Sequence, residues 1–201
     1  MEIGEVFYPR NRSEWRSWLE KNGSRATEIW VRRFRKATGI QCIDYDDLVE
    51  ECLCFGWIDG IIKKLDDESN VQRISPRKQK SFLSELNRQR VWKLEAMGLM
   101  TDAGRAPMAD QIGSPDDPWE IPDWIERRLR EDESVWNAFA NFPALYRRLK
   151  IGWITEAGQL RREEMEKRLA YLIKKTRAGK LYGTIPIRDK AVLDRWRTRS
   201  A

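Results

Sequence analysis

Two β-rich segments joined by a polar loop constrain the fold of this chain most strongly. Residues 57–65 form the first segment, residues 66–70 are acidic and polar, and residues 71–75 form the second segment. Pro76 marks the exit from the second segment, because proline has no amide proton to donate to a neighbouring strand. This pattern predicts a β-hairpin. Residues 28–36 are rich in β-branched and aromatic side chains and predict one more strand, so we expect a small antiparallel three-stranded sheet in the N-terminal half.

The loop length of the hairpin determines which residue faces Asp59 across the two strands. A five-residue loop places Asp59 opposite Arg77, and a four-residue loop places it opposite Lys78. In both registers a carboxylate lies beside a cation just beyond the mouth of the hairpin. The sequence therefore predicts that the stretches Cys54–Gly60 and Arg73–Lys80 form one local group of side chains.

The remaining segments have the periodicity of helices. Asn11 and Glu14 have the spacing of a capping box, and apolar residues recur at helical intervals along most of the chain. We expect helices at residues 12–21, 46–55, 82–97, 123–129, 133–142, 143–157, 160–177 and 188–197. Residues 99–122, which are broken by proline and glycine, are expected to form an irregular connection. The expected fold is a mostly helical α+β protein, one compact domain with an α+β part at residues 1–98 and a helical part at residues 123–201.

The chain contains no histidine, which limits the chemistry that it can perform. Ser-His-Asp and Cys-His nucleophilic catalysis, histidine-based zinc or iron sites and imidazole proton shuttling are all excluded. Cys42, Cys52 and Cys54 lack metal-finger spacing, and their odd number does not favour a disulfide framework. We therefore predict no catalytic residue, no metal and no cofactor, and we favour a binding protein over an enzyme.

The composition also bears on location and on charge. The first residues lack the basic and apolar regions of a secretion signal, and no stretch approaches 18 uncharged apolar residues, so we expect a cytoplasmic protein without a membrane span. The formal net charge is +6, but residues 44–70 hold nine acidic and two basic residues, whereas residues 72–93 hold one acidic and seven basic residues. The charges of these two blocks can therefore neutralise each other, and need not face a foreign partner.

The cations that follow the hairpin suggest a site for a small anion or a protein partner. Arg77 and Lys78 have the donors to hold a phosphate or a carboxylate. Trp57 is expected to form an aromatic wall and Asp59 to orient the arginine. The candidate ligand-binding residues are Trp57, Asp59, Arg73, Arg77, Lys78, Lys80, Ser81 and Asn87. The alternative is a structural ion pair that joins the hairpin mouth to the next helix.

The same region carries a resemblance to a known family. The residues concerned are the runs Cys54–Gly60, Gln72–Ser81 and Gly98–Gly104, together with Ser84 and Asn87. In order and spacing they resemble the YdeI/OmpD-associated family, also called the bacteriocin-protection family, over residues 13–180. The chain departs from the family at Phe82, where the family usually has tryptophan. The resemblance implies protection against bacteriocins or antimicrobial peptides and association with a porin, and it implies no reaction, cofactor or catalytic residue.

Two other functions are compatible with the sequence. Residues 160–201 carry 13 Lys and Arg against 5 Asp and Glu, which favours nucleic-acid binding through phosphates, although no DNA or RNA motif is present. A histidine-free enzyme is the other alternative, with Asp59 acting together with Lys78 or Lys80. Glu50 and Glu51 are further carboxylates for such chemistry, but neighbours on a helix cannot both face Asp59.

Overall fold

The computed structural model describes residues 2–79, 81–156 and 161–183. The chain forms two compact units. The first unit consists of Met1–Leu83 and Arg90–Gly113, and the second consists of Ser84–Gln89 and Ser114–Ala201. Helix α3 (Glu85–Ala96) therefore contributes residues 85–89 to the second unit and residues 90–96 to the first.

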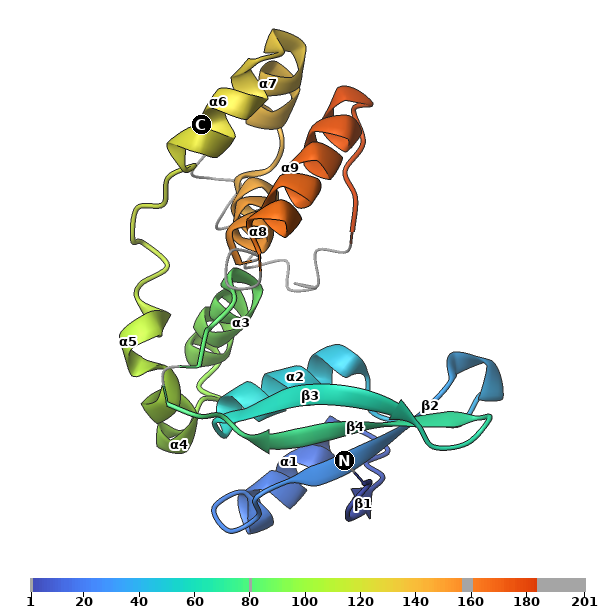
Figure 1. Cartoon of the computed structure of the whole chain (residues 1–201). Coiled ribbons are helices and arrows are strands. Elements are labelled where there is room, and N and C mark those ends of the chain that lie inside the picture. The colour runs from blue at the N-terminus through green and yellow to red at the C-terminus, as the bar shows by residue number, and fades with distance from the viewer. Residues whose placement is uncertain (1, 80, 157–160, 184–201) are drawn as a thin grey trace. The chain divides into compact units, whose positions relative to one another are not determined.

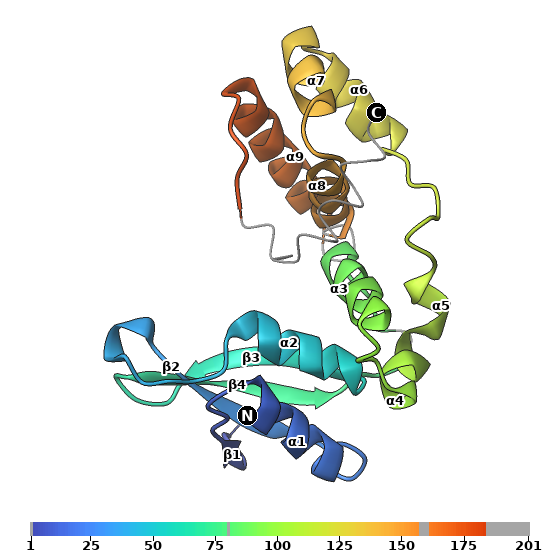
Figure 2. The ribbon, with the colours of Figure 1, turned by 180° about the vertical axis from the view of Figure 1, so that it is seen from behind.

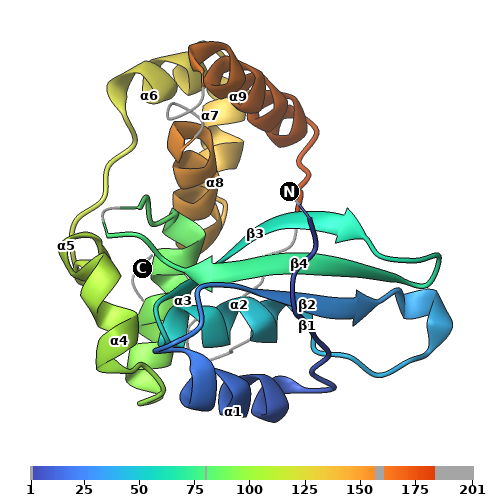
Figure 3. The ribbon, with the colours of Figure 1, turned by 60° about the horizontal axis from the view of Figure 1, so that its bottom comes forward.

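The first unit contains a mixed four-stranded sheet, seen in Figure 3. Its strands are β1 (Val6–Phe7), β2 (Ile29–Phe34), β3 (Trp57–Lys64) and β4 (Ser69–Pro76), arranged in the order β1-β2-β4-β3. Strand β1 is parallel to β2, and the other pairs are antiparallel. The α+β class is confirmed, but the expectation of three antiparallel strands is wrong. Strand β1 was missed because two residues are too few to show an alternating pattern.

The hairpin pairs in a different register from the one that the sequence predicted. Asp59 lies opposite Ile74, and Trp57 lies opposite Pro76. The expected pairing of Asp59 with Arg77 or Lys78 is therefore wrong. Both cations follow the end of β4 instead of facing the carboxylate across the strands.

Two local features account for this register. The loop is shorter than expected, because the Asp66 carboxylate accepts hydrogen bonds from the amides of Glu68 and Ser69 at 3.0 and 2.7 Å, and Leu65 already pairs with Ser69. A register shift between Asp59 and Ile62 then places one extra residue in β3. Such a β-bulge moves every later pairing along the strand, and it leaves no signal in the apolar pattern.

Helices α1 (Arg12–Asn22) and α2 (Tyr45–Cys54) cover one face of the sheet, behind the strands in Figure 1 and in front of them in Figure 2. Helix α1 begins as expected, with the Asn11 side chain accepting from the Glu14 amide at 3.0 Å. A short 3₁₀ helix, η1 (Lys36–Thr38), follows β2. The core between the helices and the sheet includes Trp15, Leu19, Ile29, Val31, Leu48, Cys52, Trp57 and Ile74.

The segment that follows α3 is more regular than expected. It contains α4 (Asp102–Arg105), a 3₁₀ turn, η2 (Ala106–Met108), and α5 (Ala109–Ile112). Residues 99–122 are therefore not one irregular connection. Helix α4 starts because the Thr101 side chain accepts from the Gly104 amide at 3.1 Å and so caps the helix.

The second unit is built from α6 (Asp123–Arg130), α7 (Glu133–Ala140), α8 (Ala144–Glu156) and α9 (Arg162–Arg177). All four helices were expected within a few residues of these bounds. Their core includes Ile125, Leu129, Val135, Phe139, Ile151, Ile154, Leu169 and Leu172. The helix expected at residues 188–197 lies outside the described residues. Within residues 2–79, 81–156 and 161–183, no helix is long and apolar enough to cross a membrane.

Candidate functional site

Trp57, the expected aromatic wall, lies in the core of the first unit. Its side chain is 1% exposed, and its indole nitrogen donates to the Gly23 carbonyl oxygen at 3.2 Å. The Trp18 ring lies edge-on to it, with the ring centroids 5.9 Å apart. Every part of the indole is therefore occupied by the fold, and Trp57 offers no free face to a ligand.

Asp59 belongs to a polar cluster on the helix-covered face of the sheet. One of its carboxylate oxygens accepts from the Tyr45 hydroxyl at 2.8 Å and from the Gln72 side-chain amide at 2.9 Å. Burial, followed by the charge of Asp59, raises the pKa of Tyr45 to about 12. The Gln72 side-chain oxygen is buried without a hydrogen-bond partner. Among the described residues, the donors to the Asp59 carboxylate are thus the neutral side chains of Tyr45 and Gln72.

Tyr45 and Gln72 were not predicted as site residues. Gln72 lies within the stretch that carried the resemblance, but no charge or spacing marks it as a partner of Asp59. Tyr45 lies at the start of α2, and only the packing of that helix on the sheet brings it to β3. The sequence therefore contained no signal for this pair.

Arg77 is more buried than Arg73 and Lys78, the other predicted cations that the structure describes. It is 6% exposed, and its backbone amide donates to the Gly56 carbonyl oxygen at 2.8 Å. Its Nη1 donates to the Ser81 hydroxyl and to the Phe82 carbonyl oxygen, both at 3.2 Å. Its Nε is buried without a partner.

No carboxylate of the described residues forms an ion pair with Arg77. Burial lowers the pKa of Arg77, and the charge of Asp59 acts in the opposite direction. Asp59 and Arg77 therefore interact through space without the direct ion pair that was one interpretation of the sequence. The guanidinium is held by uncharged oxygen atoms, which supply no counter-charge.

The other predicted residues are distributed over several places. Arg73 donates from Nε to Glu28 at 2.7 Å, and its position next to Ile74 in β4 puts it on the opposite face of the sheet from the core. Lys78 is exposed. Asn87 belongs to the part of α3 assigned to the second unit, and its backbone amide donates to the Ser84 hydroxyl at 3.2 Å. Lys80 lies outside the described residues. Of the predicted set, the structure brings together Asp59, Arg77 and Ser81.

Glu50 and Glu51 are both buried, in an ionic network that joins α2 to α1 and α3. Glu51 accepts from Arg12 Nε at 2.6 Å and from Arg16 Nη1 at 2.9 Å. Glu50 accepts from Arg12 Nη1 and from Lys93, both at 2.8 Å. These ion pairs give both carboxylates a structural role. Among the described residues, no group of three or more His, Cys, Asp or Glu side chains is arranged to hold a metal ion.

Several basic residues of α9 have acidic partners. Arg162 lies 3.6 Å from Glu166, and Arg168 lies 3.0 Å from Glu164, both pairs within the helix. Arg177 pairs with Asp132 at 3.1 Å. These carboxylates offset part of the positive charge that favoured nucleic-acid binding, so the basic helix alone does not form an unbroken phosphate-binding surface.

Comparison with known families divides the chain in two. Residues 7–107 match the family described as "Domain of unknown function (DUF8412)". Residues 118–179 match the family described as "Bacteriocin-protection, YdeI or OmpD-Associated". The resemblance to the second family is confirmed, but its match lies C-terminal to the runs at residues 54–104 that suggested it. No curated protein and no solved structure matches the chain.

Proposed function

We propose, for a chain that belongs to the family of unknown function matched over residues 7–107, that its first unit is a ligand-binding module with an anion-accepting site at Arg77. A single observation carries this proposal. Arg77 is 6% exposed and has a buried Nε without a partner, and none of the described carboxylates pairs with it. A buried charge without a counter-ion is costly, so an anion that reaches the guanidinium would offset that cost and bind favourably.

The surroundings of Arg77 support access by a small anion. Pro76, Lys78 and Gln79, which flank Arg77 in the chain, are exposed, so the backbone at this position lies at the surface. Ser81 is partly exposed, and its hydroxyl already accepts a hydrogen bond from Arg77 Nη1 at 3.2 Å. A phosphate or carboxylate can take bonds from Nε and from the Lys78 ammonium while the Ser81 contact holds the arginine in place.

Isothermal titration calorimetry with inorganic phosphate, sulfate and acetate at constant ionic strength tests the proposal. We expect one saturable site that is lost in Arg77→Met and weakened in Lys78→Ala. Arg73→Met is the matched control, because it removes the same charge from a neighbouring position that already pairs with Glu28. Equal anion affinity in Arg77→Met and in the wild type would show that the anion binds elsewhere.

The description of the family matched by residues 118–179 provides a physiological setting for this activity. We extend the proposal to a role in protection against bacteriocins or antimicrobial peptides, with the anion site acting on a partner or small ligand in that response. Cells that produce the wild type are expected to survive a bacteriocin challenge better than cells that produce Arg77→Met at the same level. Equal survival of the two strains would show that the anion site is not required for protection.

A further inference from the structure

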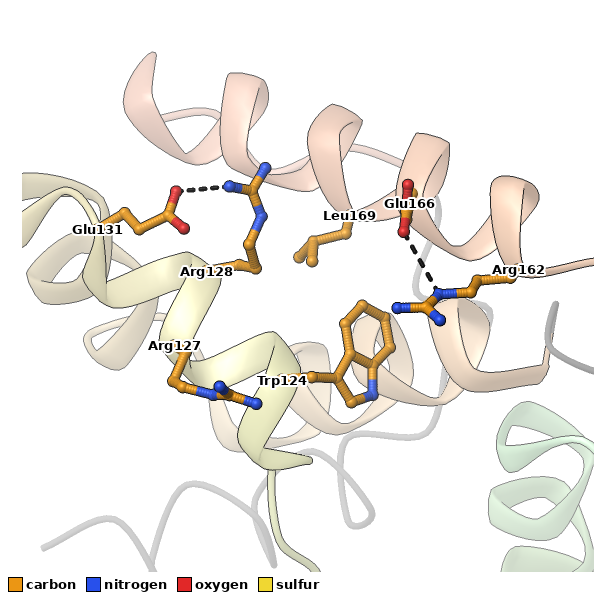
Figure 4. A pocket seen from close by; sticks show the side chains of 7 residues that line it. All are labelled: Trp124, Arg127, Arg128, Glu131, Arg162, Glu166 and Leu169. Atoms are coloured by element: carbon orange, nitrogen blue, oxygen red, sulfur yellow. Dashed lines mark hydrogen bonds and ion pairs between the residues drawn. The ribbon is translucent and has the colours of Figure 1, made fainter.

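A cleft lies between α6 and α9 in the second unit, shown in Figure 4. Its volume is about 470 Å³. It is lined by Trp124, Arg127, Arg128, Glu131, Arg162, Glu166 and Leu169. A space of this size falls within the range of pockets that hold small molecules, roughly 300–1,000 Å³. None of its lining residues belongs to the site at Arg77, so the cleft needs an explanation of its own.

The floor of the cleft is apolar and partly aromatic. Leu169 is 2% exposed, and Trp124 is partly buried against the core of the second unit. In Figure 4 the indole of Trp124 extends from α6 into the space between the two helices. A tryptophan in this position presents a flat π-surface on which a planar ring can stack.

The rim of the cleft carries three arginines. Arg127 donates weakly to the Asp123 carbonyl oxygen at 3.4 Å, and none of the described carboxylates forms an ion pair with it. Arg128 pairs with Glu131 at 2.6 Å, and Arg162 pairs with Glu166 at 3.6 Å.

Both rim pairs are weak. Each lies within one turn of chain, and all four side chains are more than half exposed, from 53% for Arg128 to 91% for Arg162. Exposed pairs of this kind contribute little to stability, so a phosphate can take the place of the glutamates without disrupting the fold. The guanidinium groups of the rim arginines can thus turn toward a ligand and donate paired hydrogen bonds to it.

We propose that this cleft binds a nucleotide, with its base stacked on Trp124 and its phosphate held by the rim arginines. Inorganic phosphate alone would leave the aromatic floor and most of the volume unused. A long acidic chain would meet the repulsion of Glu131 and Glu166, and the lining carries only one net positive charge. A compact ligand with one planar ring and one phosphate matches both the floor and the rim.

Binding of adenosine 5′-monophosphate, measured by calorimetry against adenosine and inorganic phosphate, tests this inference. We expect the nucleotide to bind more tightly than either fragment. Trp124→Leu keeps apolar volume but removes the π-surface, and it should weaken nucleotide binding roughly 5- to 100-fold. Arg162→Met should also weaken binding, whereas Arg161→Met is the matched control, because Arg161 is its exposed neighbour and does not line the cleft.

The outcomes separate this cleft from the site at Arg77. If Trp124→Leu does not fold, as shown by circular dichroism, the exposed variants Arg127→Met and Arg162→Met carry the test by themselves. Equal affinity for the nucleotide and for inorganic phosphate would overturn the proposal, and so would equal nucleotide affinity in Arg161→Met and Arg162→Met. Nucleotide binding that disappears in Arg77→Met but persists in the cleft variants would place the nucleotide in the first unit. That result would also overturn the proposal for the cleft.

Discussion

The hydroxyl of Thr101 donates a 2.6 Å hydrogen bond to the carbonyl oxygen of Cys54, and the Thr101 amide donates to the same oxygen at 3.1 Å. A Cβ atom on Gly104 would lie 2.3 Å from that oxygen, so the approach of α4 to the end of α2 requires glycine at this position. These contacts join the two runs Cys54–Gly60 and Gly98–Gly104. Residues of both runs therefore stabilise the first unit. Part of the pattern that resembles the YdeI/OmpD-associated family thus has a structural role.

Thr101→Val should destabilise the first unit by about 1–2 kcal/mol. The substitution keeps the shape of the side chain, but it removes the donor to Cys54 and the N-cap of α4. Urea unfolding followed by circular dichroism measures the loss. Thr155→Val is the control, because the partners of the Thr155 hydroxyl among the described residues are carbonyl oxygens of its own helix. Its change should stay below about 0.5 kcal/mol. Equal losses in the two variants would contradict the role of Thr101.

Gly56→Ala should be more destabilising than Gly39→Ala. Both glycines have positive φ, +72° and +68°, so alanine is strained at both positions by about 1–2 kcal/mol. A Cβ atom at residue 56 would also lie 2.3 Å from the Ala103 carbonyl oxygen, whereas residue 39 has open space around it. The difference in unfolding free energy between the two variants isolates this clash. A difference near zero would mean that α4 moves aside without cost.

The sequence was sufficient to predict elements whose signal is local. Periodicity located α1, α2 and the four helices of the second unit, and Asn11 marked the start of α1. What it missed depends on contacts across the fold or on single side chains. Strand β1 exists because it pairs with β2, and the hairpin register depends on the Asp66 turn and on one extra residue in β3.

The candidate site was predictable only as a region. Counting residues along the hairpin placed Asp59 near Arg77, and the two charges do interact, but through space and not across paired strands. Whether a side chain is buried cannot be derived from its type. Trp57 follows a turn and Arg77 follows the end of β4, both in a stretch rich in charged residues, and both side chains are buried. The cleft at Trp124 was missed because its residues come from helices that are far apart in the sequence.

Glu51→Gln should destabilise the first unit by about 3 kcal/mol or more. Glu51 is 1% exposed and accepts from both Arg12 and Arg16, so its neutralisation removes the charge of a buried carboxylate from two ion pairs at once, while Arg12 keeps Glu50 and Arg16 keeps Glu20. Hydrogen exchange of α2 amides during urea titration measures the loss within this unit. Asp67→Asn in the same unit breaks an exposed pair with Lys64 and should cost less than about 1 kcal/mol. A cost for Glu51→Gln as small as that of the control would argue against a stabilising network.

Tyr45 should make stability depend on pH in the alkaline range. Its pKa is about 12 in the fold, raised first by burial and then by Asp59, whereas an unfolded tyrosine titrates near pH 10. A raised pKa favours the neutral form, so the contribution of Tyr45 is complete below pH 10 and is lost as the pH rises through 12. Because the ring is 41% exposed, solvent screening reduces the size of this effect.

The comparison with Tyr45→Phe isolates this contribution from other groups that titrate at high pH. At pH 8 the variant should be less stable than the wild type, because it lacks the 2.8 Å hydrogen bond to Asp59. The gap between the two unfolding free energies should narrow from pH 10 to pH 12. A gap that stays constant over this range would show that the hydroxyl of Tyr45 does not titrate differently in the fold.

The three cysteines should differ sharply in their reaction with iodoacetamide. All are free thiols, but Cys52 and Cys54 are buried, whereas Cys42 is partly exposed. Burial, followed by the charge of Glu51, raises the pKa of Cys54 to about 12, and burial raises the pKa of Cys52 well above its ordinary value. The thiolate is the reactive form, so at pH 8 the native protein should be labelled at Cys42 first. Mass spectrometry of peptides measures the order, and urea should make all three react. Labelling of Cys54 as fast as Cys42 in the native protein would mean that the end of α2 opens readily, and the contacts from Thr101 would then not hold it.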